Sequence, residues 1–136
     1  MLDNAYQIIA GVVLLTVIGV AYGGTFLLRV VRGGVPANDL QQSFFRAGHA
    51  HAGVLVILGL LVMLLTQLNG VGQPWATLSF GVLVAAIFMP AGFFVSVASR
   101  DPRRPNGLIA LLWIGAASLG IGLLSAGIGL IAAGTN

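Results

Sequence analysis

The ten residues from 44 to 53 read FFRAGHAHAG and contain both histidines of the 136-residue chain, His49 and His51. An imidazole can ligate a metal or haem iron, exchange a proton near neutral pH, or hydrogen-bond lipid phosphate and water. Few other side chains offer such chemistry, because the chain has no cysteine and only three acidic residues. The histidine pair is therefore the chief candidate for polar chemistry.

The remaining polar residues exclude several classes of function. Asp3, Asp39 and Asp101 are the acidic residues, and all three lie outside the long apolar segments. Proton-driven pumps and small multidrug exporters depend on a carboxylate within the membrane, so neither class is expected. Without cysteine there is no disulfide, thiolate metal site or cysteine nucleophile. No serine, histidine and acid set stands at membrane depth, and we expect no enzyme.

The segments that position the histidines have the composition of membrane helices. The chain is 58% hydrophobic and 7% charged, whereas a soluble domain carries about 25% charged residues. A bilayer core requires roughly 20 apolar residues per helix, and four segments qualify. We expect an all-α, multi-pass membrane protein with one transmembrane domain over residues 1–136, built as a compact, glycine-rich four-helix bundle. The expected spans are residues 6–31, 44–68, 75–99 and 107–133.

The six arginines predict the orientation of these spans. Arg29, Arg32 and Arg46 flank the first loop, and Arg100, Arg103 and Arg104 lie in the third. The termini and the turn at 69–74 contain no lysine or arginine. Positive charge is retained on the cytoplasmic side, so we expect the inner (plasma) membrane and both termini outside the cytoplasm. Because the arginines border apolar spans, the pI near 10.7 does not indicate nucleic-acid binding.

Local patterns refine the boundaries. Asn38 with Gln41 three residues later resembles a capping box, so an interfacial helical turn is expected ahead of the second span. Pro90 removes a backbone hydrogen bond and predicts a kink in the third span. Trp75 suits an anchor at the outer interface.

The two halves of the chain share a spacing. Gly24-x-Phe26, Arg32 and Asn38 recur as Gly92-x-Phe94, Arg100 and Asn106 at the same intervals. Some membrane folds are duplications of this kind, although a chain with 20 glycines also produces such matches by chance. Both explanations stay open.

Glycine repeats predict close helix packing. In the fourth span, Gly115, Gly122 and Gly129 repeat every seven residues, as do Gly120, Gly127 and Gly134. The other small residues expected at helix contacts are Gly19 and Gly23 in the first span, and Gly48, Ala52 and Gly59 in the second. Such rows let membrane helices approach until their backbones touch. They favour either packing within one bundle or the seam of a homo-oligomer.

A helical wheel places the two histidines apart. At about 100° per residue, His49 and His51 flank the Gly48, Ala52 and Gly59 row on opposite sides. On a regular helix they cannot bind one metal ion together, and each imidazole must face a different neighbour.

The His-x-His pattern resembles, over about ten residues, the helix of haem-copper oxidase catalytic subunits whose two histidines point to two different haems. The chain as a whole is similar to small bacterial four-helix membrane proteins, some with a Gly-His-x-His helix start. The oxidase resemblance implies haem or metal at His49 and His51. This chain has no further histidine, so the group would be shared between protomers or with a larger subunit.

Three functions follow as hypotheses. The first is an accessory or assembly subunit of a larger membrane complex, which the oxidase resemblance suggests is respiratory. The second is a self-assembling channel or carrier, and the third is a haem- or metal-binding membrane protein using His49 and His51. The histidines could instead be interfacial, without any cofactor, or serve in a proton or pH role. We expect membrane lipids, further copies or a larger complex as partners, and no bound cofactor as the simplest case.

Overall fold

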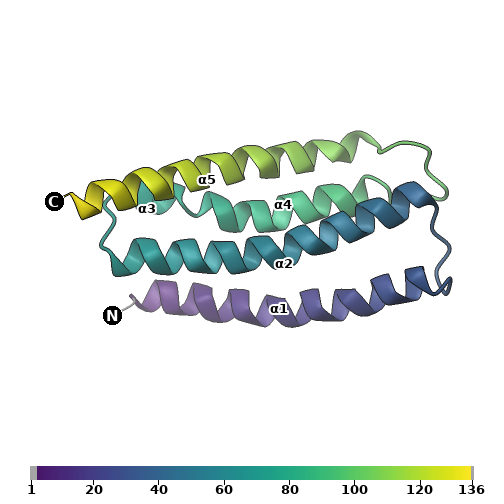
Figure 1. Ribbon diagram of the computed structural model, residues 1–136, viewed down its shortest axis with the longest axis horizontal. Coiled ribbons are helices and arrows are strands. Elements are labelled where there is room, and N and C mark those ends of the chain that lie inside the picture. The colour runs from purple at the N-terminus through teal and green to yellow at the C-terminus, as the bar shows by residue number, and fades with distance from the viewer. Residues whose placement is uncertain (1–2, 136) are drawn as a thin grey trace.

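The computed structural model describes residues 3–135, which fold as helices joined by short loops (Figure 1). The elements are α1 (Asn4–Val31), α2 (Asp39–Leu68), α3 (Trp75–Leu78), α4 (Gly81–Val95), the 3-10 turn η1 (Gly107–Ile109) and α5 (Ala110–Gly134). No strand occurs among these residues. Four helical segments are long and apolar enough to cross a membrane, α3 and α4 together forming the third. The predicted all-α class, with four helical segments long and apolar enough to span a membrane, is confirmed.

α2 begins five residues before the span predicted at residue 44, because side chains cap it. The Asn38 side chain accepts a hydrogen bond from the Gln41 backbone N–H at 2.9 Å, and the Gln41 side chain accepts one from the Asn38 N–H at 3.1 Å. Each satisfies an N–H that a helix start leaves unpaired. The predicted capping box is confirmed, and it extends α2 beyond its apolar part toward the loop.

The third span ends earlier than predicted, at Val95 and not at Ser99. The backbone leaves the helix because outside groups take its last carbonyls: Asn106 donates to the oxygens of Val95 and Ser96. The span is also interrupted at Ser79–Phe80, between α3 and α4. α4 continues through Pro90 as a helix, and the kink expected there stays a prediction.

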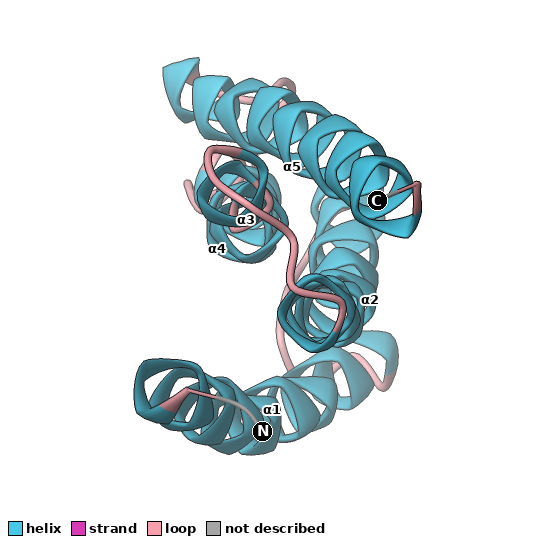
Figure 2. Cartoon of the chain, turned by 90° about the vertical axis from the view of Figure 1, so that its left-hand side faces the viewer, coloured by secondary structure: helices cyan, strands magenta, loops and turns pink. Residues whose placement is uncertain are grey.

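The four long helices follow an open arc when seen from one end, with α1 and α5 at its two extremities (Figure 2). α4 packs most extensively, against α5 on one side and α2 on the other. Buried clusters such as Leu55 with Ala85 and Met89, and Val62 with Val82 and Ala126, join these three helices. α1 packs mainly against α2, and its most apolar stretch has no buried residue.

Glycines bring the α4 and α5 backbones into contact. A Cβ on Gly122 would lie 2.6 Å from the Val82 nitrogen, and one on Gly92 would collide with the Leu112 nitrogen. The hydroxyl of Ser118 donates to the Gly81 carbonyl oxygen at 2.8 Å across the same interface. At these positions any side chain would force the two helices apart.

Candidate functional site

The two histidines face different helices. His49 lies against α1. A Cβ added to Gly23 would stand 3.6 Å from His49 Nδ1, and a Cβ added to Gly24 would stand 3.6 Å from His49 Nε2. His51 lies against α4, its ring centroid 5.0 Å from that of Phe93. The divergent arrangement predicted from the helical wheel is confirmed, and α2 remains regular between the two residues.

His51 has a defined tautomer. Its Nδ1 lies 2.7 Å from the carbonyl oxygen of Ala47, one turn earlier on α2. A carbonyl oxygen only accepts hydrogen bonds, so Nδ1 carries a proton, and in the neutral imidazole Nε2 then presents a lone pair. This is how ligating histidines are usually held, with one ring nitrogen fixed by an acceptor and the other turned to the metal.

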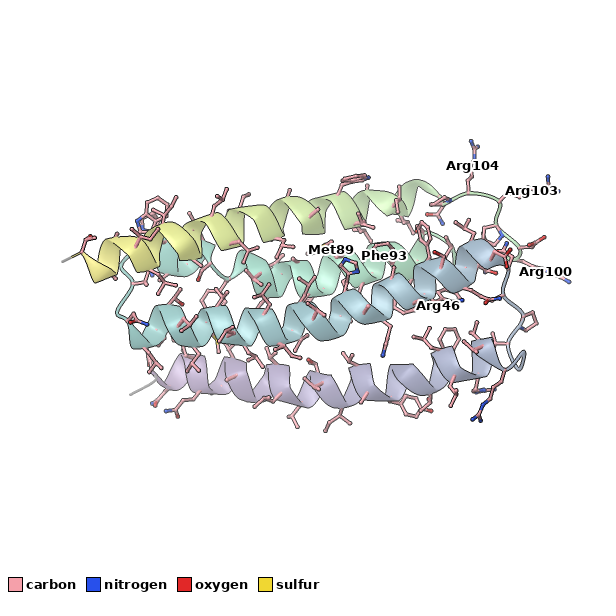
Figure 3. The ribbon with its side chains drawn as sticks, in the orientation of Figure 1. Arg46, Met89, Phe93, Arg100, Arg103 and Arg104 are labelled. Carbon is pink, nitrogen blue, oxygen red and sulfur yellow. The ribbon has the colours of Figure 1, made fainter. Side chains whose placement is uncertain are left out.

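The surroundings of His51 are apolar. Phe93 lies one turn beyond Met89 on α4 (Figure 3), and Met89 is buried among α2 and α5 side chains. Phe93 also makes an edge-on contact with Phe44 of α2, at 5.6 Å between ring centroids. These contacts fix the rotamer of the imidazole but supply no second ligand.

His49 has no hydrogen-bond partner among residues 3–135, although it is only partly exposed. The missing side chains of Gly23 and Gly24 make room for its ring between α1 and α2. Toward the loops, Phe26 of α1 meets Phe45 of α2 at 5.4 Å between ring centroids. The residue is half-buried and no buried side-chain nitrogen or oxygen among the described residues lacks a partner, so the ring nitrogens of His49 stay accessible from outside the chain.

Neither histidine belongs to a set of potential metal ligands within residues 3–135. No cluster of three or more histidine, cysteine or acidic side chains is found in the described part of the chain. Each imidazole could contribute one axial ligand to a haem, or one ligand to a metal ion shared with another chain. The proposed roles of His49 and His51 in cofactor or metal binding remain predictions.

A hydrogen-bond network ties the first loop to the third. The Asn38 amide donates to Asp101 Oδ1 at 2.9 Å and to the Pro102 oxygen at 2.8 Å. The amide of Gln41, a buried side chain, donates to the oxygens of Val97 and Ser99 at 3.0 and 3.1 Å. The sequence indicated the cap but not these cross-loop bonds. The capping-box pattern indicates only local hydrogen bonds, so it does not predict that the Gln41 amide also donates to carbonyl oxygens far along the chain.

The arginines gather at the end of the molecule that holds these two loops, opposite both termini (Figures 1 and 3). All six are exposed. Arg46 makes one weak hydrogen bond, to Gln42 Oε1 at 3.4 Å, and no ion pair is found for any of them within residues 3–135. This placement agrees with the predicted loops, while the side of the membrane they face remains a prediction.

The predicted packing residues divide into two groups. Gly48 and Gly59 of α2 face α4, at Phe94 and Leu83 respectively, and Ala52 lines a groove beside α1. In α5 the residues Gly115, Gly122 and Gly129 press on Met89, Val82 and Val71. Gly19, Gly120, Gly127 and Gly134 meet nothing within 4 Å. Gly81 and Gly92, which pack as tightly as any, were not recognised as packing residues because neither belongs to a row of glycines on one helix face.

Three features bear on function: the histidine pair, the cross-loop network, and the free row of α5 glycines, which is Gly120, Gly127 and Gly134. Known proteins add nothing to them: no protein-family model matches the chain, no curated protein matches its sequence, and no solved structure matches it.

Proposed function

We propose that the protein is an accessory or assembly subunit of a larger complex in the inner membrane, which it joins through helix surfaces. Respiratory complexes are the class that the His-x-His pattern favours. The observation that carries the proposal is the difference between the two glycine rows of α5.

One row is used within the chain and the other is free. Gly122 approaches the Val82 nitrogen so closely that a Cβ would stand 2.6 Å away, whereas Gly127 and Gly120 have no neighbour within 4 Å. The rows are about 140° apart on the helix at 100° per residue. The free row lies on the side turned away from α4.

A free glycine row has a use only if another helix covers it. Lipid tails are as apolar as leucine, so burial alone does not drive helices together in a membrane, and close van der Waals contact does. Glycine also weakens a helix relative to alanine, by roughly 1 kcal/mol in water. The seven-residue repeat therefore supports a partner helix on this face of α5.

The chain's own chemistry supports binding rather than reaction. Asp3, Asp39 and Asp101 stand at or beyond the helix ends, which leaves the interiors of the spans without a carboxylate. The polar side chains within the spans mostly bond their own helix, as Thr66 does to the Val62 oxygen at 2.9 Å.

The proposal is tested by purifying the tagged full chain from its native membrane in mild detergent and identifying co-purifying proteins by mass spectrometry. We expect a defined set of membrane subunits, which Gly127→Leu loses and Ala132→Leu keeps. Ala132 is also exposed on α5 but lies about 140° from Gly127, so its variant adds similar bulk elsewhere.

Two results would overturn the proposal. A chain that purifies alone as one copy has no complex to serve. An assembly made only of this chain would support the channel or carrier hypothesis in its place.

A second candidate, a haem- or metal-binding role, is favoured by the Nδ1 hydrogen bond of His51 to Ala47. Under this hypothesis the purified protein contains haem or metal in a fixed ratio to chain. His51→Ala loses it and His49→Ala loses it separately, because the two rings face different helices. Absorption spectra and metal analysis decide, and a colourless, metal-free protein from the native membrane rejects the hypothesis.

A further inference from the structure

A hollow of about 610 Å³ lies between the first and third loops, at the end of the molecule opposite both termini (Figure 1). Sites that hold small ligands typically measure about 300–1,000 Å³, so one ligand has room here. The walls come from α1, α2 and both loops, and they include Phe26, Val35, Phe45, Ala98, Arg100 and Asp101. The lining contains two charged residues, whereas the groove between α1 and α4 has none.

Contacts between the elements hold these walls in place. The Asn38 amide of the first loop donates to Asp101 Oδ1 and to the Pro102 oxygen of the third. On the membrane side, Phe45 of α2 meets Phe26 of α1 edge-on, with ring centroids 5.4 Å apart. The hollow is thus a formed feature of the fold and not a gap between independent loops.

Asp101 presents its carboxylate from an uncommon backbone conformation. Its φ of 48° is the one positive value among the described residues other than glycine, and asparagine and aspartate tolerate that region best. One carboxylate oxygen accepts the hydrogen bond from Asn38. No partner for the other oxygen is found within residues 3–135, and the residue is exposed, so this oxygen can accept a further hydrogen bond.

Arg100 supplies the opposite charge next to this carboxylate. Its side chain extends from the third loop beyond the helix ends (Figure 3). The residue is exposed and has no ion pair within the described part of the chain. The walls on the membrane side are apolar, with Phe26 and Phe45. The hollow therefore suits a ligand that combines an apolar part, a cationic hydrogen-bond donor and an anionic acceptor.

The depth of the hollow matches that of a lipid headgroup. Phe26 lies five residues before the end of α1, which is about 8 Å at 1.5 Å per residue, and Arg100 and Asp101 lie in the loop beyond α4. The polar layer outside the hydrocarbon core is about 5–8 Å thick on each side. The aromatic walls therefore stand where acyl chains begin, and the charged walls stand where headgroups lie.

We propose that the hollow binds phosphatidylethanolamine, a phospholipid whose headgroup contains a primary ammonium and a phosphate. The ammonium donates hydrogen bonds to the free carboxylate oxygen of Asp101, and the phosphate accepts them from Arg100. Both are charge-assisted and therefore stronger than neutral hydrogen bonds. The start of an acyl chain lies against Phe26 and Phe45.

The pair of charges distinguishes this lipid from its common relatives. Phosphatidylcholine has no N–H to donate to Asp101. Phosphatidylglycerol would bring its negative charge to that carboxylate without a cation to offset it. The hollow shares no residue with the free α5 row, so this proposal and the proposed function can fail separately.

The experiment measures the lipid that each chain retains from nanodiscs. The discs contain equal amounts of phosphatidylethanolamine, phosphatidylcholine and phosphatidylglycerol with the same acyl chains. The protein is re-extracted in mild detergent, and mass spectrometry counts the lipids that remain bound. We expect a single phosphatidylethanolamine per chain and several-fold less of the other two lipids.

Two charge variants test the headgroup contacts. Asp101→Asn keeps an oxygen for the Asn38 amide and tolerates the positive φ, but it removes the charge. It should lower the retention of phosphatidylethanolamine about five-fold, the upper value for one exposed ion pair, and Arg100→Gln should lower it by a similar factor. The matched controls are Asp39→Asn and Arg104→Gln, which remove the same charges from exposed residues outside the hollow and should leave retention unchanged.

A third variant tests the shape of the hollow. Ala98→Trp keeps every charge but fills space from an exposed wall residue, and should displace the lipid while circular dichroism shows a folded chain. Ala110→Trp adds the same bulk at the exposed start of α5, outside the hollow, and should retain the lipid. Equal retention of the three lipids, or a preference for phosphatidylglycerol, would overturn the proposal. So would an unaffected Ala98→Trp variant, or an Asp39→Asn variant that loses as much lipid as Asp101→Asn.

Discussion

The imidazole of His49 on α2 fills the space that Gly23 leaves open on α1, with Nδ1 3.6 Å from where a Cβ would stand. That separation is ordinary van der Waals contact, so a methyl group fits there and a larger side chain does not. Since α1 packs mainly against α2, this contact is one of the few that fix its position.

Gly23→Leu should therefore loosen α1, whereas Gly23→Ala should be tolerated. A leucine would push the His49 ring aside, and overpacking typically costs about 1–3 kcal/mol. Gly19→Leu is the matched control, because Gly19 lies one turn earlier on α1 with nothing within 4 Å. Thermal unfolding in detergent measures the difference. If Gly19→Leu and Gly23→Leu melt alike, His49 does not hold α1.

On α5, Gly122→Ala should destabilise the fold and Gly127→Ala should not. The new Cβ at residue 122 would lie 2.6 Å from the Val82 nitrogen, a backbone atom that moves only with α4, whereas residue 127 has open space. We expect Gly122→Ala to lower the free energy of unfolding by about 1–3 kcal/mol. Denaturation of the isolated chain in mixed detergent micelles measures both variants. A stable Gly122→Ala protein would show that the two helices are further apart than described.

At the loop end, Gln41→Leu should destabilise the protein more than Gln42→Leu. Gln41 is 8% exposed and its amide serves the carbonyls of Val97 and Ser99. Loss of the amide leaves the oxygen of the fully buried Val97 without that donor, at about 1–3 kcal/mol for a buried unsatisfied group. Ser99 is exposed, so water can replace the donor to its oxygen. The Gln42 amide donates to the Ala37 oxygen within its own loop, so we expect a loss of about 1 kcal/mol or less. Chemical denaturation of the two variants, compared with the unaltered chain, gives the ranking; the reverse order would contradict the network.

Hydropathy and helical geometry predicted much of this fold. The four spans follow from the number of apolar residues that a bilayer core demands. The divergence of His49 and His51 follows from 3.6 residues per turn. Both depend only on nearby sequence, and both hold in the structure.

The features that could not be predicted depend on contacts between distant residues. The third span stops at Val95 because Asn106 takes the last carbonyls, and nothing in the apolar run 75–99 signals this. The two glycine rows of α5 have the same seven-residue spacing, so the sequence could not tell which one faces α4.

The membrane orientation can be tested at two glycines on opposite ends of the molecule. Gly72 lies in the turn between α2 and α3, and Gly107 starts η1 after the third loop; both are exposed, with nothing within 4 Å. A cysteine at either place adds a unique thiol, since the chain has none, and disturbs no contact. Because lysine and arginine near span ends are retained in the cytoplasm, the arginine-bearing loops should face inward. An impermeant maleimide should label Gly72→Cys in intact bacterial cells, and Gly107→Cys only after the membrane is opened. Labelling of Gly107→Cys in intact cells would invert the predicted topology.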